Sequence, residues 1–386
     1  MPPITRTEAR IYATPPLDTG DQRVLTEVEE LRERLSLRLR PGRPWSGQLR
    51  RNMTARAIAG SNAIEGYPMR VSEVEALLVG EQPMGTPEPT RIEVDGYRRA
   101  LSWIQALSDA DGFAYEAGLL NSLHWMVQGH HAHKRPGRWR NRAVYVLSAG
   151  HPPVTEYTAP DPGRIPELMA LLIDWLNAGD LDQPVHVRAS MAHLNLVNIH
   201  PWCDGNGRLS RALSALLFAR DGVLPAEYSS IEEWLGYREN TWDYYRVLKR
   251  VGGATWSPEN DTHPWIKFCL RAHHLQAQSA ERRFDLYARI WEQLSEATSR
   301  LGLDERVVYA LLPAALSGKV RRAVYQHDAD LTEQTAQRDL KELVRLGWLR
   351  ADGRTRARQY VPGESMAPVV AEVLKLMPPY REPYDD

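Results

Sequence analysis

His200-Pro-Trp-Cys-Asp-Gly-Asn-Gly-Arg-Leu-Ser-Arg211 combines a histidine, a carboxylate, two glycines, an amide and two guanidiniums in one short segment. Pro201 cannot continue a preceding helix, and Gly205 and Gly207 permit the positive φ values of a tight turn. A new helix is predicted to begin at about Asn206 or Gly207, because apolar residues then recur at Leu209, Leu213, Leu216 and Leu217. Backbone N–H groups at such a helix start bind anions, so the turn predicts a phosphate site beside a general base.

The charged side chains of this segment agree with that interpretation. Arg208 and Arg211 lie three positions apart in the first turn of the new helix, where both can reach phosphate oxygens. The Asp204 carboxylate is a hard oxygen ligand of the kind that Mg²⁺ shares with phosphates. The alternative is an arginine-rich helix cap without chemistry, and the combination of base, carboxylate, glycines and arginines favours a reactive site over it.

The segment resembles the motif of the Fic (Fido) family, His-x-Phe-x-Asp/Glu-Gly-Asn-Gly-Arg-x-x-Arg. Trp202 stands where phenylalanine is usual, and every other defining position matches. The resemblance implies a protein adenylyltransferase, which transfers AMP from ATP to a Tyr, Ser or Thr hydroxyl of a target protein, or of itself. ATP is then the substrate and Mg²⁺ the cofactor.

The resemblance also implies a role for each residue of the motif. His200 would take the proton of the attacking hydroxyl, and Asp204 would hold Mg²⁺ on the α- and β-phosphates. The phosphate-binding set is Gly205, Asn206, Gly207, Arg208 and Arg211. Because His200 is predicted at a helix C-terminus, we expect the helix dipole to favour its imidazolium form.

A second motif, Ser61-Asn-Ala-Ile-Glu65-Gly66, lies at the end of a predicted helix over Leu49–Ile64, with Gly66 in the C-cap position. Ser61 and Glu65 are four residues apart and therefore share a helix face. Without the family context, a Ser and a Glu at this spacing usually indicate a solvated helix tip. The segment is similar to the inhibitory Ser/Thr-x-x-x-Glu-Gly/Asn motif of one Fic class, which implies that Glu65 forms a bidentate pair with Arg211 and blocks the γ-phosphate position.

The remainder of the chain predicts a mainly α protein, with a Fic-type helical core, a β-hairpin flap and a C-terminal winged-helix (α+β) domain. Two short extended runs, 143–147 and 154–157, flank a Gly/Pro turn and predict the hairpin. It resembles the Fic flap, whose edge holds the target segment as an added strand. The flap residues expected to bind the target are Val144, Tyr145, Val146 and Leu147.

Several other side chains leave two interpretations open. Tyr244 or Tyr245 either faces the nucleobase or packs in the core. A group of histidines at 124, 130, 131 and 133 is either a zinc or nickel site or a polar loop at a helix end, and no acidic partner stands at ligand spacing in the sequence. His186, His193 and His200 recur every seven residues, too far apart to share one ion, so His193 is interpreted as a buried support.

The last part of the chain predicts three short helices at 305–316, 319–326 and 332–346, followed by a two-stranded ribbon. This arrangement resembles a winged helix, and 319–360 contains ten Lys/Arg against six Asp/Glu. The candidate DNA contacts, on one face of the third helix, are Arg338, Lys341 and Arg345. The alternative is a module that contacts a protein or packs in a homodimer.

Composition sets the class of the protein. The chain has 386 residues, a net charge of −1 and two cysteines, so it predicts several domains, no global bias towards nucleic acid and no disulfide framework. No segment resembles a signal peptide or a membrane helix, and a cytoplasmic protein without a membrane partner is expected. The predicted divisions are an N-terminal region 1–95 with the inhibitory helix at about 50–66, a core 96–275, a connecting helix 276–304, a winged helix 305–362 and a mobile tail 363–386.

Two functional alternatives remain at this point. The chain is either chiefly an enzyme or a DNA-binding regulator whose Fic core senses nucleotide or modifies itself. Within the enzyme class, a relative of this fold could transfer UMP, phosphate or phosphocholine, or remove AMP from a modified target. The intact motif favours AMP transfer.

Overall fold

The computed structural model describes residues 9–82, 85–147, 154–353 and 358–385. Within these ranges the chain is mainly helical and has two short antiparallel ribbons, which confirms the predicted mainly α fold. The predicted turn of the flap at 148–153 lies outside the described residues. None of the described helices combines the length and the apolar composition that a membrane crossing requires.

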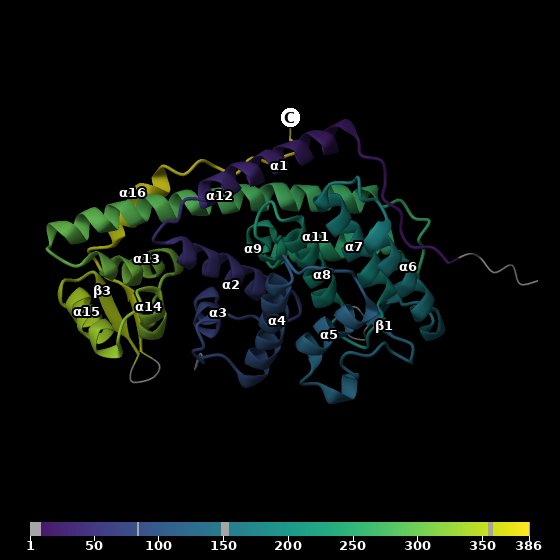
Figure 1. Cartoon of the computed structure of the whole chain (residues 1–386), viewed down its shortest axis with the longest axis horizontal. Helices are drawn as coiled ribbons and strands as arrows, with labels where there is room; N and C mark the ends of the chain where they lie inside the picture. The colour runs from purple at the N-terminus through teal and green to yellow at the C-terminus, as the bar shows by residue number, and fades with distance from the viewer. Residues whose placement is uncertain (1–8, 83–84, 148–153, 354–357, 386) are drawn as a thin grey trace, which may run out of the picture.

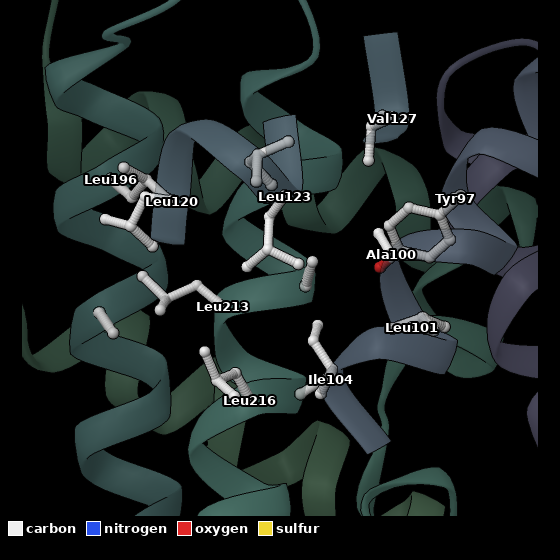
Figure 2. Packing of buried hydrophobic residues seen from close by; sticks show 14 of the residues in the cluster. Tyr97, Ala100, Leu101, Ile104, Leu120, Leu123, Val127, Leu196, Leu213 and Leu216 are labelled. Atoms are coloured by element: carbon white, nitrogen blue, oxygen red, sulfur yellow. The ribbon is translucent and has the colours of Figure 1, made fainter. Parts of the chain in front are cut away.

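The core is built around α8, a helix that is buried on nearly all sides. Its side chains Leu213 and Leu216 lie among apolar residues of α4, α5 and α7, as Figure 2 shows. The helix starts at Asn206, where the sequence predicts it, because Gly205 in the left-handed conformation ends the preceding turn. The helices of this core are α4 (Glu88–Ala106), α5 (Ala117–Gln128), α6 (Ile165–Ala178), α7 (Val185–Ile199) and α8 (Asn206–Asp221).

Helix α12 is one long helix, His263–Arg300, and α1, Thr19–Leu39, lies beside it (Figure 1). No glycine or proline follows Pro264 until Gly302, so nothing in the sequence interrupts the helix. The predicted boundary between core and connecting helix at 275/276 therefore falls inside a continuous helix. The shorter helices around the core are α3 (Val71–Leu78), η1 (Ala132–Lys134), η2 (Pro162–Arg164), α9 (Ala226–Ser229), α10 (Glu232–Leu235) and α11 (Arg238–Gly252).

The two ribbons lie in different parts of the chain. In the first, β1 (Tyr145–Leu147) pairs with β2 (Thr155–Thr158) in an irregular antiparallel register. In the second, β3 (Leu349–Asp352) pairs with β4 (Gln359–Pro362), and Val320 bridges to Tyr360. This second ribbon packs with three helices into what we call the C-terminal module, residues 305–362. Its helical elements are η3 (Glu305–Val307), α13 (Val308–Ser317), α14 (Arg322–Asp328) and α15 (Glu333–Arg345).

The segment after residue 363, predicted as a mobile tail, packs on the rest of the chain in the described residues up to 385. Helix α16, Ala367–Lys375, packs on α12, with Met366 and Val373 buried. Beyond it, Glu382 forms a two-bond ion pair with Arg271 of α12, and the Tyr384 hydroxyl donates to Asp21 of α1 at 2.9 Å. The prolines of this segment suggest an unattached chain, whereas Glu382 and Tyr384 have partners more than 100 positions away in sequence.

Helix α2, Ser46–Ile64, connects the C-terminal module with the core (Figure 1). Near its start, Gln48 donates to the Tyr309 carbonyl at 2.8 Å, and Arg51 forms a two-bond ion pair with Asp328. Near its end it passes so close to α10 that a β-carbon on Gly60 would lie 2.2 Å from the Glu232 carbonyl oxygen. The position of α2 is therefore set by contacts at both ends.

Gly60→Ala is expected to lower the free energy of unfolding by about 1–3 kcal/mol, because the backbones of α2 and α10 must separate. Gly47→Ala in the same helix is the matched control, since nothing lies within 4 Å of the place that its β-carbon would take. It should be neutral or slightly stabilising. Urea denaturation of both variants measures the difference, and equal stabilities would contradict the close contact.

Candidate active site

His200 is held at the C-terminal end of α7 in a conformation that only a few non-glycine residues adopt. Its φ and ψ are 51° and 56°, in the left-handed region. The Nδ1 atom lies 3.1 Å from the carbonyl oxygen of Val197 and donates to it. Since that bond fixes the proton on Nδ1, the lone pair of Nε2 is left to accept a proton.

The protonation of His200 differs from the sequence-based expectation. Burial lowers the pKa of His200 to about 4, although the bond to the Val197 carbonyl acts in the opposite direction. The predicted preference for imidazolium at the helix terminus is therefore wrong. Burial of the ring lowers its pKa by more than the hydrogen bond to the Val197 carbonyl raises it. The ring is neutral at pH 7, which is the form that a general base requires.

The loop after His200 is closed by Asn206 and supported by Trp202. The Asn206 side chain accepts from the Trp202 N–H at 3.1 Å and donates to the Trp202 carbonyl at 3.0 Å. The Trp202 ring is fully buried and stacks on His124 with 4.7 Å between ring centroids. The sequence predicts a phosphate contact for Asn206. In the structure its amide is occupied in fixing the loop, and the larger tryptophan ring fits beneath it.

Arg140 is a site residue to which the sequence pattern assigns no role. Its side chain is buried and donates to three carbonyl oxygens, of His200 at 2.8 Å, Arg142 at 3.0 Å and Pro160 at 2.6 Å. Burial lowers the pKa of Arg140. The residue ties the histidine loop to both ends of the flap, and no local pattern could reveal this, since its acceptors are backbone atoms.

Asp204 is half-exposed beside the N-terminus of α8. One carboxylate oxygen accepts from the Gly205 N–H at 2.6 Å, and the other pairs with Lys134. Burial alone would raise the pKa of Asp204, but Lys134 lowers it below its ordinary value, so the carboxylate is ionised. An ionised, accessible oxygen donor of this kind fits a magnesium ion, provided that the flexible Lys134 side chain moves aside.

Arg211 is buried and held by the inhibitory motif at the end of α2. Its Nη2 atom lies 2.7 Å from Glu65 Oε1, while Nε donates to the Ser61 hydroxyl at 2.7 Å and Nη2 to the Ser61 carbonyl at 3.1 Å. The predicted bidentate pair is wrong, because only one carboxylate oxygen contacts the guanidinium, while Ser61 accepts from Nε and also from Nη2. Gly66, at φ 84°, ends α2 at this point.

Gly207 is needed for this close contact and not for the turn, because it lies within α8 and, unlike Gly205, has no positive φ, which corrects the predicted turn conformation. A β-carbon at Gly207 would lie 2.6 Å from Glu65 Oε1. Glu65 therefore sits directly over the first turn of α8, where the sequence predicts the phosphate site. The carboxylate occupies the place that an anion would take.

Arg208 does not face the same space as Arg211. It is buried and its Nη1 atom lies 2.5 Å from Oε2 of Glu93 on α4. The ring of Tyr67 lies 5.7 Å from its guanidinium carbon. The resemblance implies that Arg208 binds phosphate, whereas the structure places it in an ion pair that a phosphate would have to replace.

A cavity of about 220 Å³ joins the residues of the site. Its lining includes His200, Gly207, Arg211, Glu65 and the flap residue Val146. Of the two nucleobase candidates, Tyr245 is 44% exposed and donates to the Ile64 carbonyl at 3.3 Å. Tyr244 is buried, and its hydroxyl lies 2.9 Å from Nε2 of His193, the buried support that the sequence predicts. Tyr245 is thus the tyrosine that a base could contact.

The flap lies over this cavity with one edge unpaired among the described residues. Tyr157 anchors β2 through a 2.6 Å bond from its hydroxyl to the Asn198 carbonyl, and Thr158 bridges to Thr255. On β1, Tyr145 and Val146 are exposed, Val144 precedes the strand, and the backbone of Leu147 pairs with Thr155. The outer edge of β1 is available for the added strand that the sequence predicts.

Glu232 is buried behind Arg211 and accepts the hydrogen bond of the Tyr97 hydroxyl. Burial raises the pKa of Glu232 from 4.5 to about 7. A carboxyl whose folded pKa is raised contributes stability that is complete below the unfolded pKa and is lost as pH rises through the folded pKa. Between pH 5 and 8 the protein should therefore lose about 2–3 kcal/mol that a Glu232→Gln variant keeps. Urea denaturation at both pH values measures this, and parallel pH profiles would contradict it.

The residues predicted to contact DNA lie on the exposed face of α15. Arg338 and Lys341 are exposed, and the exposed Arg345 is paired with Glu342 of the same helix at 2.5 Å. Asp339, beside them, pairs with Arg306 at 2.8 Å. Part of the positive charge counted in the sequence is thus balanced within the module.

Comparison with known proteins shows which family the chain is similar to. Residues 115–218 match the model of the Fic/DOC family. Protein adenylyltransferase Fic from Culex quinquefasciatus is 32% identical over 249 residues, which are 64% of this chain and 44% of that protein. The protein of the same name from Nematostella vectensis is 26% identical over 283 residues, 72% of this chain and 58% of that protein. The chain thus spans about half the length of these curated relatives.

The fold is also found in a solved structure. The crystal structure of a Fic family protein from Desulfovibrio desulfuricans G20 superposes with a TM-score of 0.57 at 21% identity. The match covers 92% of this chain and 99% of that chain. At this identity the likeness is one of fold.

Proposed function

We propose that this chain is a protein adenylyltransferase, which transfers AMP from ATP to a hydroxyl side chain of a target protein. The observation that carries the proposal is that His200, with a neutral ring and a free Nε2 lone pair, lines the same cavity as Arg211 and the N-terminus of α8. A base and an anion site in one cavity are two of the parts that nucleotidyl transfer needs. The similarity to proteins named adenylyltransferase supports the choice of AMP.

In the proposed reaction, His200 Nε2 takes the proton of the target hydroxyl as its oxygen attacks the α-phosphorus of ATP. The bond between the α-phosphorus and the bridging oxygen breaks, and pyrophosphate leaves. N–H groups at the start of α8 and the Arg211 guanidinium would hold the phosphates. Positioning and charge stabilisation supply most of the rate in such transfers.

Asp204 would hold the magnesium ion, because its carboxylate is ionised and accessible. When bound, the ion would neutralise charge on the phosphates and orient the leaving group. The Arg140 contacts keep the His200 loop and the flap in register, so that a target segment added to β1 would present its hydroxyl near Nε2.

The same proposal includes a restraint by Glu65. Glu65 and Ser61 hold Arg211, so ATP must displace a carboxylate to gain the guanidinium. This contact supports the inhibitory role that the sequence motif implies. We propose a cytoplasmic enzyme; both cysteines are free, as a reducing compartment requires.

The test is to incubate the purified protein and a Glu65→Gly variant with ATP and Mg²⁺ and to record intact mass. A gain of one AMP on the protein supports the proposal. A gain of phosphate would assign phosphoryl transfer, and a gain of UMP from UTP or of phosphocholine from its donor would assign that donor. Loss of AMP from a modified protein would assign removal. No covalent change with any donor, in either protein, would contradict transferase activity.

A second candidate function, DNA binding, is supported by the exposure of Arg338 and Lys341 on one face of α15. If this face contacts phosphates, log Kd should change with log salt, and each lost contact should lower that slope by about 1. Arg338→Ala with Lys341→Ala should weaken binding of random duplex DNA, measured by fluorescence anisotropy. Arg300→Ala, on α12, is the control. An absence of binding at low salt would leave the protein-contact or homodimer alternative for this module.

A further inference from the structure

Glu93, His130 and His131 meet in space although they come from different elements. Glu93 lies on α4, and the two histidines follow the end of α5. The Nε2 atoms of His130 and His131 lie 3.1 Å and 2.6 Å from the same carboxylate oxygen, Oε1 of Glu93. No acidic residue stands at ligand spacing near these histidines in the sequence, and the fold supplies one from nearly forty positions earlier.

The nitrogens of His130 are not satisfied by the described protein atoms. Both ring nitrogens are buried without a hydrogen bond, because Nε2 is out of line with Glu93 although it lies close. A buried polar group of this kind normally has a partner. His131 is partly exposed, so an ion could reach the three ligand atoms from solvent.

We propose that Glu93, His130 and His131 form a binding site for a divalent first-row transition metal of the zinc class. Two imidazoles and one carboxylate are a common ligand set for Zn²⁺ with an open position for water. The three ligand atoms lie within 4.8 Å of one another. Tetrahedral coordination needs them about 3.3 Å apart, so only a small opening of the present contacts is required. His124 is excluded, since its nitrogens contact the Asp204 carbonyl and the Gly137 N–H.

The site has a consequence for Arg208, which rests on the proposed function and on the phosphate contact that the sequence motif implies for this residue. Oε2 of Glu93 pairs with Arg208, while the proposed metal position is at Oε1. An ion on Oε1 withdraws charge from the carboxylate and weakens its hold on the guanidinium. Arg208 then becomes easier to transfer to a nucleotide phosphate, so metal and ATP should bind cooperatively.

The direct experiment is to titrate the chelator-treated full chain with Co²⁺, as a spectroscopic substitute for Zn²⁺, without nucleotide. We expect one equivalent to give the visible absorption of a nitrogen- and oxygen-coordinated ion, and Zn²⁺ to remove it by competition. His130→Ala and His131→Ala should each lower the affinity by more than about tenfold. His133→Ala, an exposed histidine of the same loop, should leave the affinity unchanged.

Equal Co²⁺ affinity of the wild-type protein, His130→Ala and His131→Ala would overturn the proposed site. The other close group, Asp18, Asp21 and His263, is tested by His263→Ala, and loss of the signal there would assign the ion to that group instead. Far-ultraviolet circular dichroism checks that each variant is folded. Cooperativity is measured separately, by comparing the ATP affinity of the metal-loaded protein, after free ion is removed, with that of the metal-free protein. Unchanged ATP affinity would overturn the link to Arg208 and leave the metal titration standing.

Discussion

His200→Ala is expected to reduce AMP transfer by about 10²–10⁴-fold while the protein stays folded. The histidine is the only candidate base that lines the described cavity with a neutral ring and a free nitrogen. Its side chain donates a single hydrogen bond, to Val197, so its removal should cost little stability. The rate of transfer from labelled ATP, in a Glu65→Gly background, gives the size of the effect.

Two controls accompany this variant. ATP affinity, measured by calorimetry, should be unchanged, because the phosphates are held by other groups. His133→Ala should be fully active. A His200→Ala protein with wild-type rate would remove the general base from the mechanism. An inactive variant that also fails to bind ATP would indicate loss of the site rather than loss of a proton acceptor.

The pH profile provides a further measurement on the same residue. Since burial lowers the pKa of His200 to about 4, its base form is fully populated from about pH 5 upward. The acid limb of the rate profile should lie near pH 4 rather than near the ordinary histidine value of about 6.5.

The second large effect is expected when Glu65 loses its charge. A charge-assisted hydrogen bond contributes about 1.5–3 kcal/mol, so releasing Arg211 should raise ATP affinity by roughly 10–100-fold. Glu65→Gln removes the charge and keeps the shape, whereas Glu65→Gly also clears the space above Gly207. Both should raise self-modification, and the glycine variant should exceed the glutamine variant.

Calorimetric titration with ATP measures this release directly. Glu167→Gln, at an exposed position on α6, is the control for loss of one carboxylate and should bind ATP as the wild-type protein does. Unchanged affinity in both Glu65 variants would mean that the observed pair with Arg211 does not restrain the protein. A gain in affinity without a gain in transfer would separate nucleotide binding from catalysis.

The parts of the site that lie close together in sequence could be predicted. The turn at Gly205 and the start of α8 follow from glycine, proline and apolar spacing within a dozen residues. The helical fold likewise follows from local periodicity. The motif at Ser61–Gly66 could be connected with Arg211 only through its resemblance to a family, because the contact joins distant segments.

Other features depend on contacts for which the sequence has no local signal. In the sequence, Glu93 looks like an ordinary polar residue of a helix. In the structure it pairs with Arg208 and contacts His130 and His131. The protonation of His200 depends on desolvation by the whole fold, which a helix-dipole argument omits. The ordered tail depends on acceptors and donors on α1 and α12. Each of these requires the tertiary arrangement.

The two ends of α2 bear on how the protein can be dissected. Deleting residues 305–386 would remove the Asp328 partner of Arg51 and the carbonyl that Gln48 contacts, and would uncover Leu49. The helix that loses these neighbours is the one that carries Glu65. An isolated catalytic fragment would therefore report the activity of an enzyme with an altered restraint, and rates from it should not be assigned to the intact chain.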